Sequence, residues 1–304
     1  MALKEFEFGF GKTTQKVSLP EEHILDILEG APTPACDVKA ATLECMRHPI
    51  GSKPLTEIVS KGDKVCIVCA DVTRIWNHSD QYVIHIVNEL NRGGIPDDDI
   101  CILFAQGTHR EQTPEEDIAV VGEELTHRVK LYQHRCKQMD ELVHVGDTKR
   151  GTPVWLNKHA VEADKIIVVD GITPHLFAGY GGGRKLILPG VAGDETIQIN
   201  HCHALGPTLG SGLNPDAKLL KIEGNPVSDD MQEACDMVHP CFLVHSIINE
   251  EGRISSMVGG RAEASLSGAA PVRAARRSSQ CRKACKAAWP TGTLRRLWPL
   301  PSTW

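Results

Sequence analysis

Short apolar runs alternate with amphipathic stretches along the middle of the chain. The strongest runs predict buried β-strands over residues 64–70, 100–105 and 165–170, because strands covered on both faces carry near-continuous apolar side chains. Weaker strand patterns occupy residues 129–132, 153–155 and 241–248.

Helical patterns lie between these runs. Residues 80–91 are expected to form a helix with Ser79 as its N-cap, and residues 159–163 a short one. Thr113-Pro-Glu-Glu116 has a capping threonine, a proline at the first helical position and a glutamate at the third, which predicts a capping box. The alternation predicts an α/β fold with a mostly parallel sheet and helices on both faces.

Polar side chains follow the three strongest strands. Asp71 and Arg74 come after the first strand, His109 and Arg110 after the second, and His175 after the third. Open α/β sheets bind ligands at the carboxyl ends of their strands. Each of these residues alone fits a turn or cap, but together they predict a site.

Residues 174–185, Pro-His-Leu-Phe-Ala-Gly-Tyr-Gly-Gly-Gly-Arg-Lys, contain the strongest chemical signal. Glycines let a ligand approach the backbone, and a lysine serves as a cation or, with a lowered pKa, as a nucleophile. The phosphate-binding P-loop pattern fails because Lys185 is followed by Leu186, and the dinucleotide fingerprint fails because Arg184 stands at its third glycine.

Composition indicates an ordinary globular protein, with 41% apolar and 24% charged residues. No run approaches the roughly 18 apolar residues of a membrane helix, and the first residues lack the apolar core of a secretory signal. We therefore expect a cytoplasmic location and no membrane partner.

Two short motifs of cysteine and histidine contain residue types that bind metals. Eleven scattered cysteines indicate reduced thiols. Cys66-x-x-Cys69 is compatible with a redox or zinc half-site, but its place inside an apolar run favours buried thiols. His201-Cys-His203 has the donors for a soft or borderline metal, but a pair of surface or core histidines is the slightly favoured interpretation.

The end of the chain differs from the rest. Residues 261–304 carry a formal charge of +8 and residues 1–260 a charge of −14, which together give −6. The tail is rich in Ala, Ser, Arg and Pro and has no apolar periodicity. A basic tail that binds acidic polymers is one interpretation; a lost reading frame near residue 259 is the one we favour. We expect an α/β domain over residues 1–258 and an irregular, poorly ordered tail over residues 259–304.

Four motifs resemble those of the nickel-pincer lactate racemase family. They follow in that family's order and rough spacing: Asp71-x-Thr-Arg74, Gly107-Thr-His109-Arg110, Pro174 to Lys185 with the Leu-Pro-Gly beyond it, and Asn200-His201. The resemblance covers roughly residues 6–258, including an N-terminal strand pair at Phe8 to Lys12 and Leu19-Pro20. It implies an isomerase that interconverts the enantiomers of lactate or another 2-hydroxy acid.

The resemblance also implies a cofactor. In that family nickel is held in the sulfur–carbon–sulfur pincer of a pyridinium-3-thioamide-5-thiocarboxylate mononucleotide. By position, Lys185 matches the lysine that carries this nucleotide as a thioamide, and His201 matches the histidine that completes the nickel coordination. Gly182 and Gly183 are expected to let the cofactor lie against the backbone, and Arg184 to offset its negative charge.

The remaining matches concern catalysis and partners. His109 and His175 match two histidines that act alternately as acid and base, as a racemase requires. Arg74, with Asp71 nearby, matches the arginine that holds substrate or cofactor. The implied partners are a small 2-hydroxy acid and the proteins that make the cofactor and insert nickel; no nucleic acid is expected.

The chain departs from the family after about residue 258. Family members continue there into a second α/β domain that closes over the cofactor and adds a catalytic lysine, whereas this sequence has the basic tail. A cleft open to water weakens electrostatic catalysis. The alternative to an active racemase is therefore a truncated, catalytically impaired fragment that binds cofactor or a partner.

Overall fold

The computed structural model describes residues 2–11, 13–27 and 32–261 and divides the chain into two compact units. The first unit contains an antiparallel hairpin of β1 (Leu3–Phe10) and β2 (Thr13–Pro20), followed by the 3₁₀ turn η1 (Glu21–His23). This confirms the N-terminal strand pair. The second unit begins at Thr33 and contains the main sheet.

The main sheet has six strands in the order β12-β11-β8-β3-β4-β5. Its strands are β3 (Val65–Ala70), β4 (Ile100–Ala105), β5 (Lys130–Gln133), β8 (Lys165–Gly171), β11 (Phe242–Ile248) and β12 (Ile254–Gly260). All neighbours are parallel except the edge strand β12, which runs antiparallel to β11. The predicted mostly parallel sheet is confirmed, while the sequence patterns did not predict β12.

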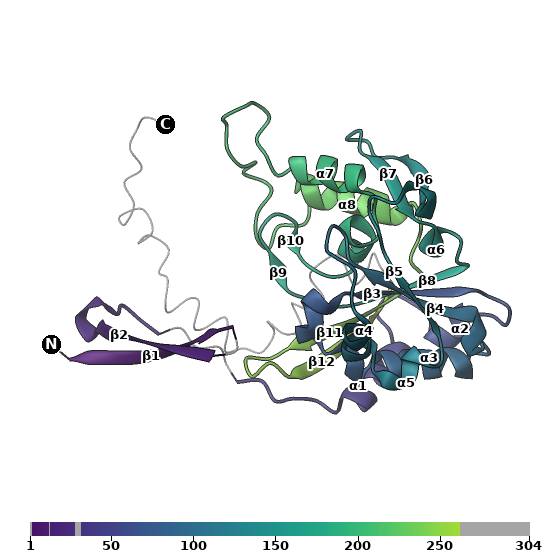
Figure 1. Ribbon diagram of the computed structural model, residues 1–304, viewed down its shortest axis with the longest axis horizontal. Helices are drawn as coiled ribbons and strands as arrows, with labels where there is room; N and C mark the ends of the chain where they lie inside the picture. Colours follow the sequence, from purple (N-terminus) through teal and green to yellow (C-terminus); the bar gives the residue numbers. More distant parts are fainter. Residues whose placement is uncertain (1, 12, 28–31, 262–304) are drawn as a thin grey trace. The chain divides into compact units, whose positions relative to one another are not determined.

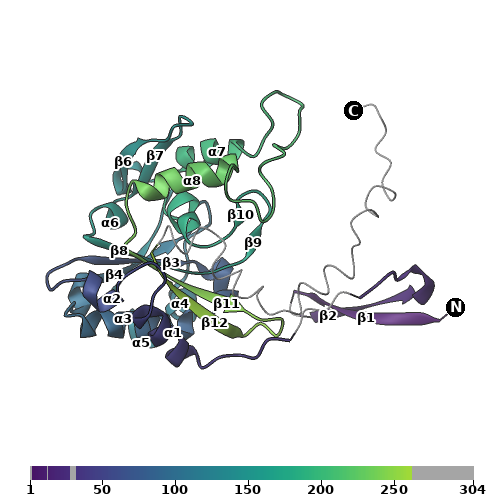
Figure 2. The same cartoon turned by 180° about the vertical axis from the view of Figure 1, so that it is seen from behind.

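Helices cover both faces of this sheet, as expected (Figures 1 and 2). One face carries α1 (Val38–Arg47), α2 (Leu55–Ile58), α3 (Val83–Arg92), α4 (Pro114–Val121) and α5 (Glu123–Thr126). The other carries α6 (Lys158–Val161), α7 (Asp194–Cys202) and α8 (Pro226–Asp236), together with a ribbon of β6 (Leu142–Asp147) and β7 (Pro153–Asn157). The predicted strand at residues 153–155 thus belongs to this separate ribbon.

Shorter elements complete the chain. They are β9 (Pro174–His175), β10 (Gly179–Tyr180), the π-helical turn η6 (Leu186–Gly190) and the 3₁₀ turns η2 (Val72–Asn77), η3 (Ser79–Gln81), η4 (Asp97–Asp99) and η5 (Met139–Glu141). No helix in the described part of the chain is both long and apolar enough to span a bilayer.

The two cysteines of Cys66-x-x-Cys69 lie in different cores. Successive side chains of a strand point to opposite faces, so residues three apart on β3 face opposite helical layers. Both are fully buried, and burial raises the pKa of Cys69 to about 12. The two thiols cannot share a metal, which confirms the interpretation as buried apolar residues.

The predicted helix starts are right in one case and wrong in two. Thr113 forms the expected capping box with Glu116. Ser79 does not cap α3, which begins at Val83 after the turn η3; its Oγ instead donates to the carbonyl oxygen of Val120 at 2.7 Å. The helix predicted over residues 159–163 is α6, which ends at Val161.

The main sheet extends slightly past the expected end of the α/β domain. β12 continues to Gly260, two residues beyond the expected end of the α/β domain at residue 258. Most of the expected tail, from residue 262 on, lies outside the described residues. The tail therefore stays a prediction.

Two glycines with left-handed backbone give a matched test of packing. Gly179 and Gly151 have φ of 77° and 80°. A Cβ on Gly179 would overlap the carbonyl oxygen of Lys221, whereas a Cβ on Gly151 meets nothing within 4 Å. We expect Gly151→Ala to lower the free energy of unfolding by about 1–2 kcal/mol, the cost of this backbone conformation, and Gly179→Ala to lower it further. Urea denaturation measures both, and equal losses would contradict the close packing of Gly179.

Candidate active site

A cavity of about 410 Å³ lies at the carboxyl ends of β3, β4 and β8. The volume is in the range of small-molecule sites. The polar side chains that line it come from all three strand ends, the glycine segment and α7: Asp71, Arg74, Gln106, Thr108, His109, Asp170, Thr173, His175, Lys185 and His201. The structure thus gathers nearly all the residues expected from the sequence.

The position follows from the order of the strands. The chain passes from β3 outward to β4 and β5 and then returns to the other side of β3 with β8. In open α/β sheets the crevice at such a reversal is where ligands bind, because the loops on either side leave in opposite directions.

His109 is oriented by Asp71. Its Nδ1 lies 2.7 Å from Oδ2 of Asp71, a carboxylate that is 3% exposed and also accepts a hydrogen bond from the hydroxyl of Thr73 at 2.6 Å. A carboxylate only accepts, so Nδ1 of His109 carries the proton and Nε2 keeps its lone pair. This tautomer can take a proton at Nε2.

His175 has the opposite tautomer. Its Nδ1 accepts hydrogen bonds from the backbone N–H groups of Phe177 at 3.3 Å and Ala178 at 3.1 Å, so the proton of the neutral ring is on Nε2. Burial, followed by the charge of Lys185, lowers the pKa of His175 to about 4. The neutral ring can therefore donate from Nε2 at pH 7.

Lys185 has an amine of lowered basicity. Burial, followed by the charges of Arg74 and Arg184, lowers its pKa to about 8, while Asp170 acts in the opposite direction. A pKa this close to neutrality leaves a substantial fraction of free amine, which is the nucleophilic form.

Arg184, which was expected to offset the charge of a cofactor, does not line the cavity itself. It is 1% exposed, and its Nη2 donates to the carbonyl oxygen of Ala178 at 3.0 Å and to Oγ of Ser228 at 2.7 Å. The guanidinium therefore ties the glycine segment to α8. Its remaining influence on the cavity is the effect of its charge on Lys185.

Two further residues expected near the site, Gly183 and Arg110, do not line the cavity. Gly183 is buried and does not line the cavity; with φ of 57° it turns the backbone, while Gly182 beside it does form part of the wall. Arg110 also stays outside the cavity, because it pairs with Glu116 at 2.6 Å.

His201 and His203 point in different directions. Nδ1 of His201 donates to the carbonyl oxygen of Ile197 at 2.8 Å, which leaves the lone pair of Nε2 free, as in a metal-binding histidine. Nε2 of His203 lies 3.2 Å from the hydroxyl of Thr152, on another side of α7. The pair does not form a chelate, and within the described ranges no three His, Cys, Asp or Glu side chains group as a metal site.

Asp170 is a cavity residue that the sequence reasoning did not select. It accepts hydrogen bonds from the backbone of Gly171 at 2.7 Å and from Nδ2 of Asn77 at 3.2 Å, and burial raises its pKa to about 6. Its position at the carboxyl end of the 165–170 strand was the signal available. Trp76 also lines the cavity and packs closely against Gly171.

Comparisons with known proteins agree with this arrangement. A family described as the lactate racemase N-terminal domain matches residues 10–212. A lactate racemase of Thermoanaerobacterium thermosaccharolyticum is 29% identical over 264 residues, which are 86% of this chain and 60% of that protein. A lactate racemase of Lactiplantibacillus plantarum is 32% identical over 218 residues, which are 71% of this chain and 49% of that one.

Solved structures give the same result for the fold. The lactate racemase apoprotein of Thermoanaerobacterium thermosaccharolyticum superposes with a TM-score of 0.75 at 30% identity, covering 87% of this chain and 61% of that one. A Thermotoga maritima protein at 23% identity has a TM-score of 0.62 and shares the fold. The chain spans between half and three fifths of the length of these curated relatives. By its motifs, its fold and the extent of the family match, the chain belongs to the lactate racemase N-terminal domain family.

Proposed function

We propose that this chain is the cofactor-holding part of a nickel-dependent racemase of lactate or other short 2-hydroxy acids. The observation that carries the proposal is the pair of imidazoles in one cavity with opposite tautomers, His109 and His175, beside the weakly basic amine of Lys185. A racemase needs a matched acid and base, and this pair supplies one.

The residues present fit a lysine-bound pincer nucleotide. His201 offers a free Nε2 donor, and it belongs to no group of three or more His, Cys, Asp or Glu in the described part of the chain, so the bound nucleotide would supply other ligands to a nickel ion held there. Gly181 and Gly182 leave a stretch of the cavity wall without side chains, against which a flat ring can lie. The free amine of Lys185 is the form that makes a thioamide.

The two histidines move the hydroxyl proton. The bound cofactor supplies the hydride acceptor for the substrate's Cα hydrogen. His109 takes the hydroxyl proton of one enantiomer at Nε2, and His175 gives a proton from Nε2 to the oxygen when the planar 2-keto acid takes hydride on its other face. Each turnover leaves one extra proton on His109 and one too few on His175, and exchange with solvent restores both rings. The roles are exchanged for the reverse reaction. The guanidinium of Arg74 can bind the substrate carboxylate with two hydrogen bonds.

A second function is a catalytically impaired fragment that binds cofactor or a partner. It is favoured by the basic tail without apolar periodicity that follows the α/β pattern. We infer that the domain expected over residues 1–258 continues through β12 to Gly260 and that an out-of-frame tail follows it; sequencing the gene again across codons 255–265 tests this. In either case the partners are the cofactor-making and nickel-inserting proteins of the cytoplasm.

Intact-mass analysis tests whether the chain binds the cofactor, as both proposed functions require. After co-expression with cofactor-making enzymes, we expect a mass increase of one pincer nucleotide, located on Lys185 by peptide mapping. Lys185→Arg should abolish the adduct, because a guanidinium does not form the thioamide. Lys158→Arg, on α6 and outside the cavity, should retain it. An unmodified Lys185 in the parent protein would refute the proposed tether.

The pH dependence of amine acetylation tests the lowered basicity of Lys185. The free amine reacts, so Lys185 should reach half of its maximal rate near pH 8. Lys64 should need a higher pH than an ordinary lysine, because its hydrogen bond to Asp99 raises its pKa. Arg74→Gln should shift the midpoint of Lys185 upward. Pulse labelling with peptide-resolved mass spectrometry gives all three midpoints, and a Lys185 midpoint near that of Lys64 would contradict the prediction.

Turnover separates the two proposed functions. With cofactor and nickel bound, we expect residues 1–304 to racemise lactate more slowly than the full-length relatives, because the basic tail has no α/β pattern that would close the cleft to water. His109→Gln and His175→Gln should each reduce the remaining rate by about 10²–10⁴-fold, the usual contribution of a general acid or base. Chiral chromatography of the products measures the rates. Turnover equal to that of a full-length relative would rule out the impaired fragment.

A further inference from the structure

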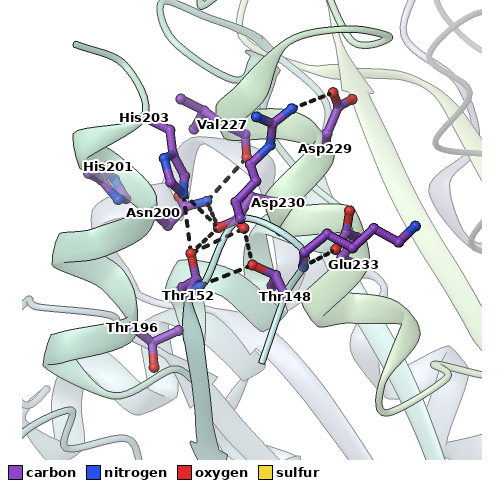
Figure 3. A network of polar contacts seen from close by, with 12 residues as sticks. Thr148, Thr152, Thr196, Asn200, His201, His203, Val227, Asp229, Asp230 and Glu233 are labelled. Atoms are coloured by element: carbon purple, nitrogen blue, oxygen red, sulfur yellow. Dashed lines mark hydrogen bonds and ion pairs between the residues drawn. The ribbon is translucent and has the colours of Figure 1, made fainter. Parts of the chain in front are cut away.

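Asp230 on α8 is a fully buried carboxylate outside the cavity (Figure 3). Its Oδ1 accepts a hydrogen bond from the hydroxyl of Thr148 at 2.5 Å, and its Oδ2 accepts from the hydroxyl of Thr152 and from Nδ2 of Asn200, both at 2.9 Å. Nε2 of His203 lies 3.6 Å from the same Oδ2. Asp230 therefore connects α8, α7 and the turn between β6 and β7.

A carboxylate in this position needs all of its donors. Burying a charge without partners costs many kcal/mol, so the position is stable only while donors surround both oxygens. One of the donors, Asn200, belongs to α7, and its Nδ2 also donates to the carbonyl oxygen of Val227 at 3.2 Å. The C-cap residue of α7, His203, adds an ion-pair contact at 3.6 Å. Rotation of α7 about its axis would break these bonds together.

The same rotation would move His201. Residues three apart lie on one side of a helix, so Asn200 and His203 face Asp230 together, whereas His201 is turned about 100° from Asn200. Figure 3 shows His201 projecting away from Asp230, and His201 lines the cavity. The side of α7 that is held by Asp230 thus determines the direction of the histidine on its other side.

We propose that Asp230 is a positioning residue that fixes the rotation of α7 and so directs the His201 imidazole into the cavity. The expected effect on nickel binding rests on the proposed function, whereas the orientation of His201 is independent of it. Asp230 reaches the site through Asn200 and the helix backbone, with no contact to substrate or cofactor.

The adjacent Asp229 provides a matched control. It is also on α8 and also contacts the turn between β6 and β7, through Nη2 of Arg150 at 3.4 Å. This pair is partly exposed and does not involve α7. Asp229→Asn removes a charge one residue away and leaves the hydrogen bond from Asn200 to Asp230 and the contact of Asp230 with His203 in place.

The first experiment uses the chain without cofactor. Imidazole ¹H–¹⁵N spectra, with the His201 signals assigned by His201→Gln, report which ring nitrogen carries the proton. We expect the parent protein and Asp229→Asn to show His201 protonated on Nδ1. Asp230→Asn should keep this tautomer, because the bond from Nδ1 of His201 to Ile197 lies within α7. It should shift the His201 imidazole signals, because its amide turns a donor toward Asn200 and Thr152 and releases α7. An unchanged His201 signal in folded Asp230→Asn would overturn the proposal.

If Asp230→Asn does not fold, a second variant tests the same proposal. Asn200→Ala keeps Asp230 with both threonines but removes the bond to α7, and the same change at His201 is expected. Circular dichroism establishes folding of each variant, and a parent-like His201 in folded Asn200→Ala would also overturn the proposal.

Nickel retention gives the functional readout. In the chain carrying the Lys185 adduct, we expect Asp230→Asn to weaken nickel binding by about 10–100-fold in competition with a chelator, the usual effect of losing a residue that orients a metal ligand. The adduct mass should not change, and Asp229→Asn should bind as the parent does. Parent-like nickel binding in folded Asp230→Asn would contradict the positioning role. Absence of any adduct in the parent would refute the proposed function alone, while the imidazole spectra still decide the role of Asp230.

Discussion

The parallel hydrogen bonding of β4, β3 and β8 is the constraint on which the site depends. The register pairs Ala70 with Ala105, and Cys69 with Val169, so the three strands end at nearly the same level. The next residues along each chain segment then meet at one edge of the sheet. A shift of one residue in the pairing of β3 with β8 would turn Asp170 to the opposite face and separate it from the cavity.

Positive charge in a partly desolvated space sets the chemistry of the cavity. Arg74, Arg184 and Lys185 all act on the same region, and Asp170 is the carboxylate that opposes them at Lys185. The balance lowers the basicity of Lys185 and keeps His175 neutral. Asp71 acts locally, because its contact with Nδ1 of His109 selects a tautomer. The two histidines therefore differ in proton position through their different partners, a carboxylate in one case and backbone N–H groups in the other.

Much of the fold could be predicted from the sequence, because buried parallel strands carry an apolar pattern that other structures rarely share. The strands at residues 100–105 and 165–170 are observed within one residue of their predicted ends. Element starts were less certain: Ser79 has the chemistry of an N-cap but its hydroxyl bonds to Val120, from a segment far along the chain. The edge strand β12 has a Gly- and Ser-rich sequence with a weak apolar pattern.

The sequence by itself determined the fold class and the set of chemical groups at the strand ends, since hydrophobic periodicity and the order of motifs are properties of the chain alone. The tertiary structure decided which groups face the cavity. Arg184 and Lys185 are adjacent in sequence, yet one is tied to α8 and the other lines the cavity. His201 and His203 are likewise separated by the turn of α7 and by the contact with Asp230. The direction of a side chain depends on packing partners far away in the sequence, and no local pattern contains them.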